Sequence, residues 1–157
     1  MVNKYTSLTI LFLFLIYGCG FKVVDKNASN NFDIVEIKTT GDNRINFNLK
    51  NRLLYSSKKN LGNPISVNIN TEKNKRIKEK NIKNQITKYE IEININVSLI
   101  EIKKQKKHEF NILKTSAYNV AEQYSQTLNN EKKLVELMTE EMVDDILEEI
   151  NNNLNDL

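Results

Sequence analysis

The chain has 157 residues, a formal net charge of +3 and a single cysteine. This length suits one domain with one small core, and a lone cysteine excludes an intramolecular disulfide. With only four glycines, the sequence has no phosphate-binding glycine loop, nucleophile elbow or calcium loop, so we expect a binding protein rather than an enzyme.

The first feature in chain order is an apolar run that ends at Cys19. One charge, Lys4, precedes an uncharged stretch over residues 8–17, and Gly18 stands directly before the cysteine. This layout is typical of a cleaved lipoprotein signal peptide, because the thiol takes a diacylglyceryl group and a small preceding residue admits the peptidase. A membrane-spanning anchor is the alternative, but about ten apolar residues fall well short of the ~20 that span a bilayer.

These features predict a signal peptide over residues 1–18, a lipidated cysteine with a flexible tether over residues 19–31, and a single α+β domain over residues 32–157. The covalent lipid on Cys19 is the only cofactor that we expect. Gly20, rather than Asp, after the cysteine favours delivery to the outer membrane, with the protein anchored on its periplasmic face.

The first half of the domain has a strand–helix–strand pattern. Residues 32–39 are apolar and β-branched, which predicts a strand, and Gly41 and Asp42 then supply a breaker and a helix N-cap. A helix over residues 44–58 is indicated by Ile45, Leu49 and Leu53 at four-residue spacing, with Phe47 and Leu54 broadening the stripe. Residues 65–70 alternate as a second strand. This order implies a parallel pair of strands with the helix on one face of the sheet.

The second half contains the clearest pattern in the chain. After a charged connection of uncertain form over residues 71–86, a long third strand is predicted by apolar residues at every second position: Tyr89, Ile91, Ile93, Ile95, Val97 and Leu99. At Leu99 and Ile100 two apolar residues follow one another, so the apolar positions move to the other face of the strand, as a bulge or burial of both faces would explain. A polar turn over residues 103–107 leads to a fourth, antiparallel strand over residues 110–120.

A long amphipathic helix over residues 134–157 completes the domain. It has apolar residues at four-residue spacing (Leu134, Met138, Met142, Ile146, Ile150 and Leu154), widened by Leu137, Val143, Leu147 and Leu157. We expect its carboxylates to form a solvated face rather than a metal site: Glu136, Glu140, Asp144, Glu148 and Glu149. The fold class expected is α+β, with a four-stranded mixed sheet, two helices on one face and the order β-α-β-β-β-α.

Charge is distributed unevenly along the chain. Residues 73–107 hold eleven Lys and Arg against four acids, whereas residues 131–157 hold two Lys against nine acids. The basic segment lacks the interleaved aromatic residues of a nucleic-acid site, so we expect anionic lipid rather than nucleic acid as its partner, although lysines also simply solvate loops. His108, the only histidine, has no second histidine or cysteine beside it and is interpreted as a surface residue.

Several short motifs, in this order and spacing, resemble the LPS-assembly lipoprotein (LptE) family. They are Cys19-Gly20-Phe21, the opening of the long strand at Thr87-Lys88-Tyr89-Glu90-Ile91, the end of the fourth strand at Ser116-Ala117-Tyr118-Asn119, and the acidic terminal helix. The resemblance covers nearly the whole chain. It implies a protein that plugs the lipopolysaccharide-translocating β-barrel LptD at the periplasmic side of the outer membrane, and that binds lipopolysaccharide.

This resemblance gives the basic segment a role, since Lys and Arg bind the phosphates of lipid A by charge-assisted hydrogen bonds. The candidate lipopolysaccharide contacts, chosen by charge density and expected loop placement, are Lys73, Lys75, Arg76, Lys78, Lys103, Lys104, Lys106 and Lys107. The alternative is a lipid-anchored scaffold of another envelope complex, such as a secretion or barrel-assembly machine, that never touches lipopolysaccharide.

Overall fold

The computed structural model of the protein describes residues 31–60 and 62–155. The predicted signal peptide, Cys19 and nearly all of the predicted tether lie outside the described residues, as does Leu157 at the end of the predicted terminal helix.

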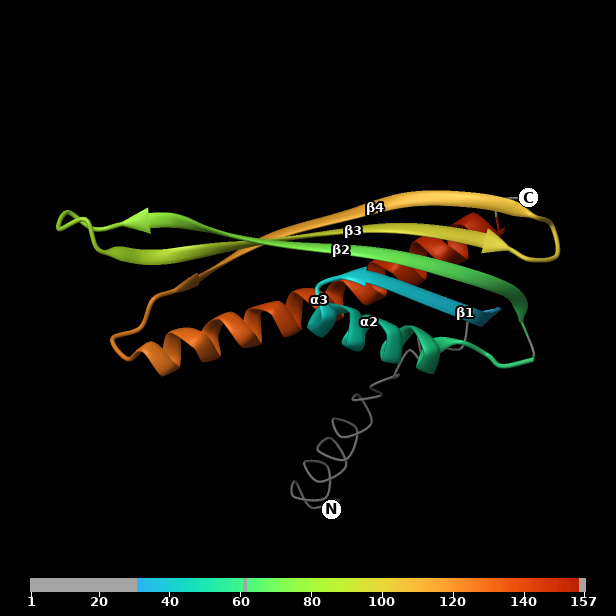
Figure 1. Ribbon diagram of the computed structural model, residues 1–157, viewed down its shortest axis with the longest axis horizontal. Coiled ribbons are helices and arrows are strands. Elements are labelled where there is room, and N and C mark those ends of the chain that lie inside the picture. Colours follow the sequence, from blue (N-terminus) through green and yellow to red (C-terminus); the bar gives the residue numbers. More distant parts are fainter. Residues whose placement is uncertain (1–30, 61, 156–157) are drawn as a thin grey trace, which may run out of the picture.

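The described residues form one sheet with two helices. The elements are β1 (Phe32–Gly41), α2 (Asn43–Ser56), β2 (Asn63–Lys80), β3 (Ile86–Glu101), β4 (Lys106–Asn119) and α3 (Tyr124–Asn155). The sheet order is β1-β2-β3-β4, with β1 parallel to β2 and the other neighbours antiparallel. Both helices cover the same face of the sheet (Figure 1). The expected α+β class, mixed sheet and element order are thus confirmed.

The core lies between this face and the two helices. Alternate residues of β3 from Ile91 to Leu99 are at most 2% exposed, as are Ile65, Val67 and Ile69 of β2. On the helix side of the core, α2 contributes Ile45, Leu49 and Leu53, and α3 contributes a stripe from Met138 through Met142, Ile146 and Ile150. The period of two in the strands and the period of about 3.6 in the helices therefore bury one apolar layer.

The junction between β1 and α2 is built by Gly41 and Asp42. Gly41 has a φ of +97°, and a Cβ atom there would lie 1.8 Å from the carbonyl oxygen of Thr71. Only glycine fits this close approach of two backbones. The side chain of Asp42 then accepts hydrogen bonds from the amides of Arg44 and Ile45, which confirms it as the N-cap of α2.

The largest difference from expectation is the segment predicted as a charged connection over residues 71–86. Most of it is strand, because β2 runs on to Lys80 and pairs with the first half of β3 through a turn over residues 81–85. Every residue from Glu72 to Lys80 is exposed, so no apolar alternation marked this part as strand. In Figure 1 this end of the β2–β3 hairpin extends past the first turn of α3.

Smaller corrections concern element limits. The register of β3 is continuous through Leu99 and Ile100, so a bulge, one of the two explanations left open for the shift in alternation, is absent there. The register shifts of the sheet lie at Ile34/Glu36 and within 77–80. The turn after β3 is shorter than predicted because β4 begins at Lys106, and α3 begins at Tyr124, ten residues before the predicted start.

Two predicted core residues on the helices are exposed. Phe47 of α2 is 67% exposed and Leu137 of α3 is 54% exposed. Phe47 lies two positions from Ile45 and Leu49, which turns it to the opposite side of the helix from the buried stripe.

Candidate binding surfaces

The structure divides the eight candidate basic residues into two groups at different positions along the sheet. Four of them (Lys73, Lys75, Arg76 and Lys78) lie on β2, and four (Lys103, Lys104, Lys106 and Lys107) lie in the β3–β4 turn and the start of β4. Lys73 is opposite Ile93, and Lys106 is opposite Glu101. Eight residues of strand separate these positions, or about 27 Å. The expected placement of the first group in a loop is wrong, and the two groups do not form one site.

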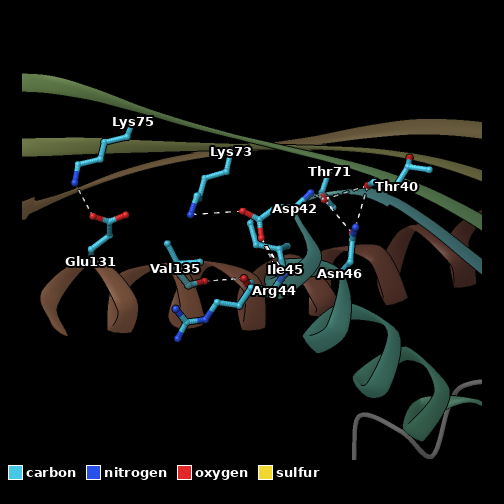
Figure 2. A network of polar contacts seen from close by, with 11 residues as sticks. Thr40, Asp42, Arg44, Ile45, Asn46, Thr71, Lys73, Lys75, Glu131 and Val135 are labelled. Carbon is cyan, nitrogen blue, oxygen red and sulfur yellow. Dashed lines mark hydrogen bonds and ion pairs between the residues drawn. The ribbon is translucent and has the colours of Figure 1, made fainter. Parts of the chain in front are cut away.

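Each basic residue of the β2 group has a carboxylate partner. On the helix side of the sheet, the Nζ atom of Lys73 lies 3.5 Å from Asp42 and that of Lys75 lies 2.6 Å from Glu131 (Figure 2). Arg76 and Lys78 converge on Glu90, at 2.5 and 2.8 Å. The positive charge of this group is therefore largely balanced within the protein itself.

Lys75 is the centre of a cluster that joins β2, β3, β4 and α3. Its Nζ lies 4.2 Å from the ring centroid of Tyr89, which stacks on Tyr118. The hydroxyl of Tyr118 donates to the same Glu131 oxygen that Lys75 binds, at 2.7 Å. Burial by itself opposes the charged form of both partners, but the hydrogen bonds outweigh it. The pKa of Lys75 is consequently raised and that of Glu131 is lowered.

Beside this cluster, a buried network of hydrogen bonds joins the N-terminal end of α2 to β1 and β2 (Figure 2). The hydroxyl of Thr71, 1% exposed, lies 2.9 Å from the side-chain oxygen of Asn46 and accepts a hydrogen bond from the amide of Asp42. The side-chain amide of Asn46 in turn donates a hydrogen bond to the backbone carbonyl of Thr40 at 3.0 Å. These bonds satisfy the polar groups where β1 ends, so the network is structural in character.

The second basic group surrounds Glu101, a buried carboxylate at the end of β3. Its oxygens lie 3.0 Å from Nε2 of His108 and 3.2 Å from Nζ of Lys104. Burial raises the pKa of Glu101, but these two partners outweigh it and the net pKa is lowered. His108 is half-buried against Glu101 rather than being the surface residue expected.

The remaining lysines of the second group differ from one another. Lys107 pairs with Glu109 at 2.5 Å. Lys103 and Lys106 pair with no carboxylate of the described residues. They are therefore the two candidate cations whose charge the described part of the chain leaves available.

The carboxylates of α3 do not form the purely solvated face that we expected. Glu136 pairs with Arg44 of α2 at 3.4 Å, and Glu140 pairs with Arg52. On the other side of the helix, Lys114 of β4 lies 3.2 Å from Glu141 and 3.0 Å from Asp145. The acidic helix is thus held between two basic elements.

The face of the sheet away from the helices carries a row of amide side chains, which sequence reasoning did not single out. The Asn111 amide donates to the side-chain oxygens of Asn94 and Asn96 on β3, at 2.5 and 2.8 Å. Asn96 and Asn111, together with Asn68 and Asn70 of β2, line a shallow groove of about 770 Å³ that crosses the sheet. The signal in the sequence was the polar half of each alternating strand.

Within the described ranges, no cluster of three or more His, Cys, Asp or Glu side chains could hold a metal ion. Among the same residues, no helix has the length and apolar character needed to cross a membrane.

Comparison with known proteins places this arrangement among solved lipoprotein structures. No protein-family model and no curated protein matches the chain. Lipoprotein B from Nitrosomonas europaea matches with a TM-score of 0.63 and 15% identity, over 88% of this chain and 94% of that one. Rare lipoprotein B from Shewanella oneidensis matches with a TM-score of 0.55 and 13% identity, over 75% and 95%. The chain shares its fold with these lipoproteins. A lipoprotein from Caulobacter crescentus matches as well, with a TM-score of 0.52 and 15% identity over 75% of this chain and 89% of that one.

Proposed function

We propose that the protein is a lipid-anchored outer-membrane protein that plugs an LptD-type β-barrel and serves lipopolysaccharide transport. The observation that carries this proposal is the fold shared with lipoprotein B over 88% of the chain, joined to the lipidation motif at Cys19. The outer face of the sheet also carries Asn68, Asn70, Asn96 and Asn111, whose side-chain amides suit contact with the polar interior of a barrel.

The decisive test of the partner is a mild-detergent pulldown of the acylated protein from its own outer membrane, followed by mass spectrometry. We expect a large barrel at near equal stoichiometry. Recovery of a secretion or barrel-assembly complex instead would refute the plug and leave a lipid-anchored scaffold with the same fold. A Cys19→Ser variant should lose its membrane attachment in the same preparation.

Lipopolysaccharide binding is the second part of the proposal. Lys103 and Lys106 are the strongest of the eight candidates because the described residues offer them no carboxylate partner, so a lipid A phosphate can bind them without breaking an ion pair. The four cations of β2 would first have to leave Asp42, Glu131 or Glu90.

The corresponding test compares two double variants that lose the same charge. Lys103→Gln with Lys106→Gln should weaken lipopolysaccharide binding by about thirtyfold, at about 1 kcal/mol for each lysine near an anionic surface. Lys132→Gln with Lys133→Gln, on exposed or half-exposed positions of α3, is the matched control and should change binding little. Equal effects of the two pairs would show that only net charge matters.

A further inference from the structure

The helix α2 has apolar residues on two opposite sides. Ile45, Leu49 and Leu53 face the core, whereas Phe47 is 67% exposed and Tyr55 is 84% exposed. A solvated helix needs one apolar stripe, so this second set of large side chains is not explained by the core.

The charges around this second set are of one sign. No acidic residue occurs between Asn43 and Lys59. Arg44 and Arg52 turn toward α3 and pair with its carboxylates, whereas Lys50 and Lys59 are exposed and pair with no carboxylate of the described residues. Exposed aromatic rings flanked by lysines are the composition that settles at the boundary between lipid headgroups and acyl chains.

The position of α2 relative to the lipid tether points to the same surface. The described chain begins at Asn31 beside the C-terminal end of α2, where the amide of Lys58 donates to the Phe32 carbonyl at 3.0 Å and the amide of Ile34 donates to Ser57 Oγ at 2.8 Å. Asn31 is twelve residues after Cys19. Such a tether reaches about 40 Å when extended and about 20 Å on average when flexible. A lipid on Cys19 would therefore hold this end of α2 close to the bilayer.

We propose that the outer surface of α2, formed by Phe47, Lys50 and Tyr55, together with Lys59 in the turn that follows the helix, lies on the anionic phospholipid leaflet that holds the lipid anchor. The contact rests on the lipidation of Cys19 given above as part of the proposed function. It adds a protein contact to the lipid anchor and fixes the orientation of the domain.

The absence of tryptophan from the sequence allows a direct test. Single-tryptophan forms of the full acylated protein, Phe47→Trp and Tyr55→Trp, are added to vesicles of phosphatidylethanolamine and phosphatidylglycerol (3:1) with brominated acyl chains. The matched control is Leu113→Trp, on the outer face of the sheet and 57% exposed. We expect at least threefold stronger bromine quenching at positions 47 and 55 than at 113, and a weaker effect when Lys50→Glu and Lys59→Glu are added.

The outcomes separate this contact from the lipid anchor. If the protein floats with the vesicles but positions 47 and 113 are quenched equally, the contact of α2 is refuted while the anchor stands. If the acylated protein does not float, the anchor fails and the contact fails with it. If position 47 is unquenched by brominated lipid yet shielded from acrylamide in native membranes, another protein covers α2, and the lipid contact is again refuted.

Discussion

The ion pair between Lys75 and Glu131 should hold the first turns of α3 against the sheet, which the substitution Glu131→Gln tests. The glutamine keeps the size of the side chain but removes the charge that receives both the Lys75 ammonium, at 2.6 Å, and the Tyr118 hydroxyl, at 2.7 Å. A hydrogen bond to a charged group contributes about 1.5–3 kcal/mol when shielded. The Lys75 side chain is 37% exposed, so solvent screening reduces this to about 1–2 kcal/mol for the whole cluster.

The sign of the pH dependence follows from the lowered pKa of Glu131. A carboxyl whose pKa is lower in the folded state contributes its stability fully above the unfolded pKa, near 4.5, and loses it as the pH falls through the folded value. Urea unfolding followed by circular dichroism should therefore show the loss for Glu131→Gln at pH 7 and a much smaller loss near pH 3.

A control and a double-mutant cycle complete this test. Glu136→Gln, which removes an exposed partner of Arg44 at 3.4 Å, should cost less than about 0.5 kcal/mol. Combining Glu131→Gln with Lys75→Met should give a coupling energy of about 1 kcal/mol. Equal losses for the two glutamine variants, or a loss at position 131 that does not change with pH, would refute the reasoning.

Three further predictions concern the fold and the second basic group. Gly41→Ala should lower stability by at least about 1–3 kcal/mol, measured by thermal unfolding, because a side chain at φ +97° meets the Thr71 carbonyl; an unchanged Tm would contradict this. Met142→Ala, fully buried, should cost about 2–5 kcal/mol, whereas Leu137→Ala on the exposed side of α3 should stay within about 0.5 kcal/mol in urea unfolding. Glu101→Gln should flatten the fall in stability as the pH drops below about 4.5, the ordinary pKa of a Glu side chain, because the lowered pKa of Glu101 stabilises the folded state above that value; a pH profile like that of the unmodified protein would count against it.

The sequence was sufficient for the elements that bury one face. The alternation from Tyr89 to Leu99 and the four-residue spacing in α3 follow directly from the requirement to face one core, so their type and order could be predicted. The second half of β2 has no buried side. Ion pairs across the strands, such as Arg76 with Glu90 and Lys88 with Glu79, join it to β3. These pairs depend on the register of the two strands, which the sequence does not show.

The candidate basic sites were less predictable because charge density does not show which cations are already paired. Lys75 and Glu131 are 56 residues apart in the sequence, and Lys73 binds the N-cap of a different helix. Only tertiary structure separates these engaged lysines from Lys103 and Lys106. The exposed side of α2 was missed for a related reason: Phe47 was counted with the core stripe although a residue two positions away on a helix faces elsewhere.

The order of strands in the sheet has a consequence for the order in which the chain folds. From β2 onward, each strand pairs with the next across a short turn, so these pairs form between residues close in sequence. Such local contacts form quickly. The pairing of β1 with β2 forms later because the α2 crossover separates the two strands, and α3 can pack only after the sheet that it covers has formed. We expect pulsed hydrogen exchange during refolding to protect the amides of β3 before those of α3. Earlier protection of α3 would show that the helix, and not the three-stranded meander, organises folding.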